Sequence, residues 1–173
     1  MYKRNLIFYS FILIIPILDQ LSKIYAVANL KGDAAVPVLH GFLSFRYHEN
    51  RGAAWGMFAD QRWVFMTAST IAIIGIIAYL IWTIRQKHPI LYVTSLVLFA
   101  GGGIGNMIDR IRLGYVIDFL RFDFIDFPIF NVADSFITIG AGLMILYLIL
   151  ETIREISAKK QNNGNSTSIP KEK

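Results

Sequence analysis

The sequence contains no cysteine and only three histidines among its 173 residues. The absence of cysteine excludes disulfides, a thiol nucleophile and thiolate metal sites. His40, His48 and His88 do not have the spacing of metal ligands, and no H-E-x-x-H motif occurs. The residues that remain to carry chemistry are carboxylates, amides, hydroxyls and basic groups.

The sequence also has few charges. Only 17% of its residues are charged and 55% are hydrophobic, whereas soluble domains have about 25% charged and roughly 45–50% apolar residues. This shift favours a membrane protein with a single domain. The net charge of +5 does not indicate a nucleic-acid partner, because the basic residues lie between apolar runs and in the C-terminal tail rather than in one patch.

Four segments are long and apolar enough to be transmembrane helices, which need about 20 residues each. They are residues 5–28, 63–84, 89–108 and 132–152. The first also resembles a secretory signal peptide ending at Ala26-Val-Ala28. Asp19 and Lys23 separate its apolar core from those alanines, so a retained span is the better interpretation.

Four spans place both termini on the same side of the membrane. The basic counts of the two sides nearly balance, but Lys3, Arg4 and the short turn at residues 85–87 favour the cytoplasm for both ends. We expect one membrane-embedded domain over residues 1–157. The tail 158–173 is rich in Lys, Asn, Ser and Gln, which predicts a disordered cytoplasmic segment.

Two segments, residues 29–62 and 109–131, then lie on the side of the membrane opposite to the cytoplasm. Residues 43–48 alternate apolar and polar side chains, which predicts a half-exposed strand, and a turn signal follows at residues 50–52. We expect a small extracytoplasmic β-sheet resting on the membrane surface. The second segment mixes aromatic and charged residues, which is typical of an interfacial amphipathic piece.

Polar residues gather at the outer ends of three predicted spans. Ionisable groups within membrane spans are costly unless they are paired or functional. Because these clusters are far apart in sequence but share one membrane face, we expect them to converge in space. They are Asp19 and Lys23 in the first span, Asn106, Asp109 and Arg110 in the third, and Asn131 and Asp134 in the fourth.

Each cluster also has a purely structural interpretation. Asp19 and Lys23 are spaced i,i+4 and could simply neutralise each other. Residues 101–105 form a G-x-x-x-G pattern, which is typical of close helix packing. Asn131 could cap the fourth helix, with Asp134 in its first turn.

Paired carboxylates are the chemistry that these residues favour. A Ser22–Lys23 dyad is disfavoured because neighbouring side chains on a helix do not face each other. Asp118, in the outer segment, and Asp134, at the start of the last span, form the natural pair. Two adjacent carboxyls share a proton, so one can activate water while the other donates to a scissile carbonyl.

Two other functional classes compete with a peptidase. A small proton-coupled transporter would also use membrane carboxylates, but the inner halves of the second, third and fourth spans are almost purely apolar. An assembly partner that uses the G-x-x-x-G pattern would leave the outer polar layer unexplained.

Five motifs together resemble the bacterial lipoprotein signal peptidase family, also called signal peptidase II. The order and spacing of the motifs agree with that family from about residue 5 to 150, with four spans. The motifs lie at residues 19–23, 50–56, 102–110, 114–118 and 130–134.

The resemblance implies an aspartic endopeptidase of the bacterial cytoplasmic membrane, monomeric and surrounded by membrane lipids, with its active site at the extracytoplasmic face. Its substrates would be diacylglyceryl-modified prolipoproteins, cut just before the lipidated cysteine. Asp118 and Asp134 would be the catalytic dyad, with no metal or other cofactor. Residues implied to bind substrate or support the site are Asp19, Lys23, Asn50, Gly52, Ala54, Asn106, Asp109, Arg110 and Asn131.

Overall fold

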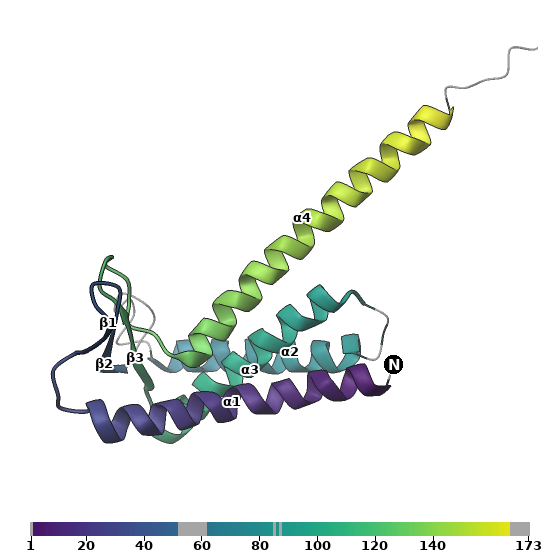
Figure 1. Ribbon diagram of the computed structural model, residues 1–173. Coiled ribbons are helices and arrows are strands. Elements are labelled where there is room, and N and C mark those ends of the chain that lie inside the picture. The colour runs from purple at the N-terminus through teal and green to yellow at the C-terminus, as the bar shows by residue number, and fades with distance from the viewer. Residues whose placement is uncertain (1, 52–61, 85, 87, 167–173) are drawn as a thin grey trace, which may run out of the picture.

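The computed structural model describes residues 2–51, 62–84, 86 and 88–166, so the predicted substrate contacts Gly52 and Ala54 lie outside the described residues. Helices α1, α2 and α3 run beside one another, with the sheet at one end, and α4 leaves that end and inclines away (Figure 1). In chain order, the elements are α1 (Tyr2–Leu30), β1 (Val36–Leu39), β2 (Leu43–Asn50), α2 (Arg62–Ile84), α3 (Ile90–Leu113), β3 (Val116–Phe122) and α4 (Val132–Ser166).

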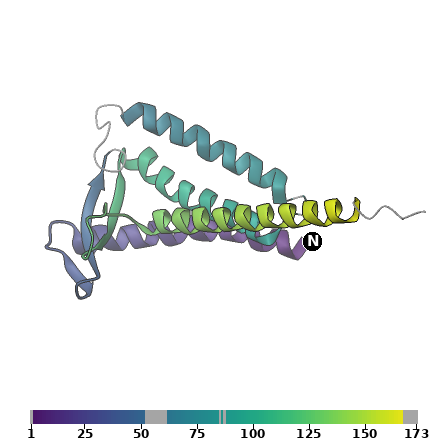
Figure 2. The ribbon, with the colours of Figure 1, turned by 90° about the horizontal axis from the view of Figure 1, so that it is seen from above.

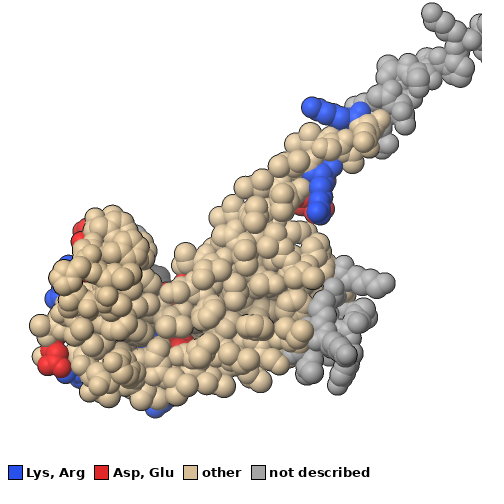
Figure 3. Space-filling view, viewed as in Figure 1, with Lys and Arg blue, Asp and Glu red and all other residues tan. Residues whose placement is uncertain are grey.

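Three of the described helices are long and apolar enough to cross a membrane: Ile7–Leu30, Ile90–Leu113 and Val132–Gln161. In α2 the corresponding described run, Thr70–Thr83, is shorter. The face in Figure 3 shows few charged side chains along the helices, and they gather near the sheet and toward the far end of α4. The protein is therefore a mainly helical membrane protein.

The helices extend beyond the predicted spans, and the extension is longest at the C-terminal ends of α3 and α4. Helix α3 continues past residue 108 to Leu113, because Asp109 is buried rather than placed in an outer loop. It ends at Gly114, whose left-handed backbone (φ 78°) lets its N–H bond to the Arg110 carbonyl at 3.0 Å. Helix α4 continues to Ser166, where the sequence predicts disorder from residue 158.

The sheet has three antiparallel strands in the order β1-β2-β3. The strand predicted at residues 43–48 is confirmed as part of β2. The segment 109–131, predicted as an interfacial amphipathic piece, instead supplies the end of α3, strand β3 and a loop. Its residues 116–122 become a strand because β2 offers a free edge, with Asn50 opposite Val116 and Leu43 opposite Phe122.

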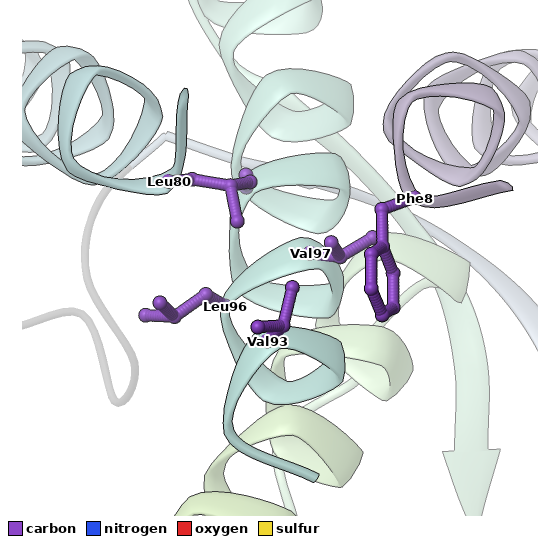
Figure 4. Packing of buried hydrophobic residues seen from close by; sticks show 6 residues of the cluster. Phe8, Leu80, Val93, Leu96 and Val97 are labelled. Carbon is purple, nitrogen blue, oxygen red and sulfur yellow. The ribbon is translucent and has the colours of Figure 1, made fainter. Parts of the chain in front are cut away.

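The three side-by-side helices share an apolar core at the end remote from the sheet. Figure 4 shows Leu80 of α2 and Phe8 of α1 on either side of α3, which contributes Val93, Leu96 and Val97 to the same cluster. These side chains are buried among apolar neighbours. The cluster holds the helices together by close packing, which is the main attraction between helices in lipid.

Glycines bring α3 into close contact with α1 and α4, and Figure 2 shows α4 overlying α1 and part of α3, with α2 to one side. A Cβ on Gly101 would lie 2.8 Å from Cβ of Ile15, and one on Gly105 would lie 2.7 Å from Oδ2 of Asp19. A Cβ on Gly102 would lie 2.5 Å from the Ala133 carbonyl oxygen. The packing interpretation of residues 101–105 is therefore confirmed.

We predict that Gly102→Ala lowers the melting temperature in detergent, because the added methyl group would press on the backbone of α4. Overpacking of this kind costs about 1–3 kcal/mol. The matched control is Gly142→Ala on α4, where an added Cβ meets nothing within 4 Å. Equal melting temperatures for the two variants, measured by intrinsic fluorescence, would contradict this account of the α3–α4 contact.

Candidate active site

A buried cluster of ions lies where α1 and α3 meet the sheet. Lys23 Nζ is 2.7 Å from Asp19 Oδ2 and 2.9 Å from Asp109 Oδ2, and all three side chains are at most 2% exposed. Asp19 also accepts the N–H of Ala133 on α4, and Asp109 accepts the N–H of Ile117 on β3. The cluster therefore connects α1, α3, β3 and α4.

Gln20 belongs to this cluster, although sequence reasoning did not assign it to the site. Its Nε2 donates to Asp109 Oδ1 at 2.8 Å and to the Gly105 carbonyl at 3.2 Å. The available signal was its place beside Asp19, as a further polar residue in an apolar span.

Asn106 connects the ion cluster to the carboxylate of Asp134 through hydrogen bonds. Lys23 Nζ donates to Asn106 Oδ1 at 3.0 Å, and Asn106 Nδ2 donates to Asp134 Oδ1 at 2.7 Å. Because the oxygen of the amide faces the ammonium group, its NH₂ faces the carboxylate. Lys23 thus orients Asn106, and Asn106 holds Asp134.

Asn131 caps α4 and joins the two predicted catalytic carboxylates. Its Oδ1 accepts the N–H of Asp134 at 2.9 Å, and Asp134 Oδ2 accepts the N–H of Asn131 at 3.3 Å, as in a capping box. Its Nδ2 donates to Asp118 Oδ1 at 2.6 Å and to Asn106 Oδ1 at 3.0 Å. The cap and the site are therefore made by the same side chain.

Asp118 lies on β3 and is fully buried. Its Oδ2 accepts Nδ2 of Asn50 at 2.9 Å. Asn50 faces Val116 across the sheet, so it is a diagonal neighbour of Asp118 on the same face. Burial raises the pKa of Asp118 to about 7, and the negative charge of Asp134 adds to this rise, although the amides of Asn50 and Asn131 oppose it.

Arg110 adds a positive charge at the same level. Its guanidinium donates to the Asn106 carbonyl at 3.3 Å and is attracted electrostatically by Asp134 and Asp118. The structure thus brings together nine of the predicted site residues: Asp19, Lys23, Asn50, Asn106, Asp109, Arg110, Asp118, Asn131 and Asp134.

Two neighbouring carboxyls, one of which keeps a proton near neutral pH, are the chemical basis of aspartic peptidases. In this protein, Asp118 and Asp134 share Asn131 as a hydrogen-bond partner at the sheet end of the membrane helices, an arrangement that fits the class of membrane aspartic peptidases. The family model described as signal peptidase (SPase) II matches residues 11–150. The chain belongs to this family of aspartic peptidases.

Individual relatives agree with the family. The chain is 43% identical over 149 residues to a lipoprotein signal peptidase of Streptococcus pyogenes serotype M6, covering 84% of this chain and 94% of the relative. It is 42% identical over 149 residues to that of serotype M5, with the same coverage.

Two solved structures titled as bacterial membrane enzymes are similar in fold. The first has a TM-score of 0.71 and 34% identity, and the match covers 84% of this chain and 88% of that chain. The second has a TM-score of 0.70 and 31% identity, with 82% and 91% covered.

The raised pKa of Asp118 predicts a pH-dependent stability. The folded protein binds a proton on Asp118 more tightly than the unfolded chain does. The contribution of Asp118 to the stability of the fold is therefore most favourable below about pH 4. It is lost progressively as the pH rises to about 7, and is constant above that value. Asp118→Asn removes the titration. We expect the melting temperature of the variant minus that of the unmodified protein to increase from pH 4 to pH 7.

The measurement is a series of melting curves for both proteins from pH 4 to 8 in one detergent. The asparagine also changes the hydrogen bonds with Asn50 and Asn131, so the absolute offset carries no information and only the slope is read. A difference in melting temperature that is constant over this range would contradict the raised pKa.

Proposed function

We propose that this protein removes the signal peptide from prolipoproteins whose cysteine at the cleavage site carries diacylglycerol, and that it cuts just before that cysteine. Asp118 and Asp134 are the catalytic dyad in this proposal. The observation that carries it is the Asn131 side chain, which donates to Asp118 while its oxygen accepts the N–H of Asp134. Relatives named lipoprotein signal peptidase supply the substrate class.

The dyad carries one proton near neutral pH. Burial of Asp118 favours that proton on Asp118, which leaves Asp134 as the general base. Asp134 takes a proton from a water molecule, whose oxygen attacks the scissile carbonyl, while Asp118 donates its proton to the carbonyl oxygen. The tetrahedral intermediate then collapses and the C–N bond breaks. Asp134 gives its proton to the departing amine, and Asp118 takes a proton back from a hydroxyl of the intermediate, which leaves a carboxyl product and restores the dyad.

The surrounding residues prepare this chemistry. Asn106 and Asn131 each donate to one carboxylate and limit its rotation. Asn50, which ends β2 beside Asp118, is placed to contact a substrate backbone. Arg110 offsets part of the negative charge of the dyad. Gly52 and Ala54 follow Asn50 in the same motif, and the family resemblance assigns them to substrate contact.

The transporter interpretation finds less support in this arrangement. A proton or solute pathway needs polar groups through the whole membrane thickness. In the half of the helices nearest the sheet, the described carboxylates Asp19 and Asp109 lie in one layer with Lys23. The other half of α1, α2 and α3 holds the apolar cluster around Phe8, Leu80 and Val97.

We further propose that α2 is a fourth span, that both termini are cytoplasmic, and that the sheet and dyad lie outside. Because the chain has no cysteine, single cysteines test this directly. On intact cells, a membrane-impermeant maleimide should label Asp33→Cys, beyond α1, and should label Lys160→Cys, near the end of α4, only after lysis. Labelling of both from the same side would contradict four spans, and the reverse pattern would contradict the orientation.

The activity test uses a synthetic diacylglyceryl prolipoprotein peptide and the purified protein. We expect Asp118→Asn and Asp134→Asn each to lower the cleavage rate by at least about three orders of magnitude, because each removes one member of an acid–base pair. The matched control is Asp126→Asn in the exposed loop after β3, which should cleave normally.

The outcomes of this experiment separate the two parts of the proposal. Full activity in either dyad variant would remove that residue from the mechanism. Cleavage of the same peptide without its lipid at an equal rate would contradict the lipidated substrate class. Circular dichroism checks that all the proteins compared are equally folded.

A further inference from the structure

A cavity lies on the side of the sheet away from Asp118. It has a volume of about 380 Å³ and is lined by α1, the last turns of α3, Tyr47 of β2 and the start of β3. Ile117 lines it, and successive side chains of a strand point to opposite faces, so Asp118 points away from it. The cavity is therefore on the opposite face of β3 from Asp118, and neither Asp118 nor Asp134 lines it.

Two exposed basic side chains, Arg112 and Lys31, line this cavity. Arg112 lines it and donates to Gln20 Oε1 at 3.4 Å. Within the described part of the chain, no carboxylate forms an ion pair with Arg112. Its guanidinium is thus available to an anion.

Lys31 is a second basic side chain that lines the cavity. Among the described residues it forms an ion pair with one carboxylate, Glu49, which also pairs with Arg51. Glu49 is 3.2 Å from Lys31 Nζ and 2.8 Å from Arg51 Nη2. These hydrogen bonds lower the pKa of Glu49 to about 2, so it is ionised at neutral pH, yet it supplies one negative charge for two positive ones. On the inner wall, Lys23 is already paired with both Asp109 and Asp19, so the basic groups left for an anion are Arg112 and Lys31.

The position of the cavity relates it to the lipid headgroups. The candidate spans of α1 and α3 end at Leu30 and Leu113, immediately beside Lys31 and Arg112. Basic residues at span ends lie at the headgroup level, where tyrosines such as Tyr47 and Tyr115 are also enriched.

Apolar side chains continue from the cavity toward the membrane interior. Ile24 lines the cavity at 60% exposure, and Leu21 one turn closer to the hydrocarbon is 59% exposed. On α3, Ile111 is 73% exposed. A molecule with an anionic head and apolar chains fits this arrangement. Its head would reach the basic residues, and its chains would lie along the exposed apolar side chains of α1 and α3.

We propose that this cavity binds the phosphate group of an anionic phospholipid from the leaflet on the sheet side, with Arg112 and Lys31 as the phosphate ligands. A guanidinium binds phosphate oxygens through two parallel hydrogen bonds, and an ammonium adds a point charge. A diacylglyceryl group on a substrate cysteine carries no phosphate, so this site is separate from substrate recognition.

The test measures melting temperature in a neutral detergent as phosphatidylglycerol is added, with phosphatidylcholine of the same acyl chains as the zwitterionic comparison. A ligand that binds only the folded state raises the melting temperature in a saturable way. We expect this rise with phosphatidylglycerol alone. In the double variant Lys31→Gln/Arg112→Gln, the half-saturating lipid concentration should increase at least about tenfold.

The matched control is Arg154→Gln/Lys159→Gln, which removes two basic residues from the exposed far part of α4 and should behave as the unmodified protein does. Each variant is compared with its own melting temperature without lipid, so a change in folding stability does not enter the result. An equal response in the double variant, or an equal response to phosphatidylcholine, would overturn the proposal. A rise of the same size with glycerol phosphate would overturn the lipid as its source.

Discussion

The ammonium group of Lys23 between Asp19 and Asp109 is the interaction on which the rest of the structure depends. Charges buried in a low-dielectric region are tolerated only when they are paired and hydrogen-bonded, and loss of one partner costs about 3–5 kcal/mol. The carboxylates here also accept backbone N–H groups of Ile117 and Ala133. The same few atoms therefore fix where β3 and α4 begin relative to α1 and α3.

The side-chain amides that hold the proposed catalytic carboxylates, those of Asn131 and Asn106, also stabilise the fold. Asn131 starts α4 as its cap and in the same conformation donates to Asp118. Asn106 accepts from Lys23 and donates to Asp134. The structural and functional interpretations of these residues, which are alternatives at the level of sequence, are therefore compatible. A buried dyad needs fixed neighbours, and helix caps and ion clusters provide them.

Local patterns account for what the sequence predicts correctly. Apolar runs indicate helices, alternation indicates the strand at residues 43–48, and charges in apolar spans indicate a shared polar layer. Strand β3 was missed because its pairing depends on β2, which is distant in sequence and offers the free edge. Gln20 was missed for a similar reason, since its partners Gly105 and Asp109 belong to another helix.

Helix α4 is much longer than a membrane span requires. Its 35 residues correspond to about 52 Å of helix at 1.5 Å per residue, whereas the hydrocarbon layer is about 30 Å thick. An upright α4 that begins beside the dyad would extend about 20 Å beyond the hydrocarbon on the other side of the membrane. A fluorophore or surface tether attached there would stand clear of both the lipid and the chemistry, which makes this helix a convenient anchoring point for single-molecule experiments.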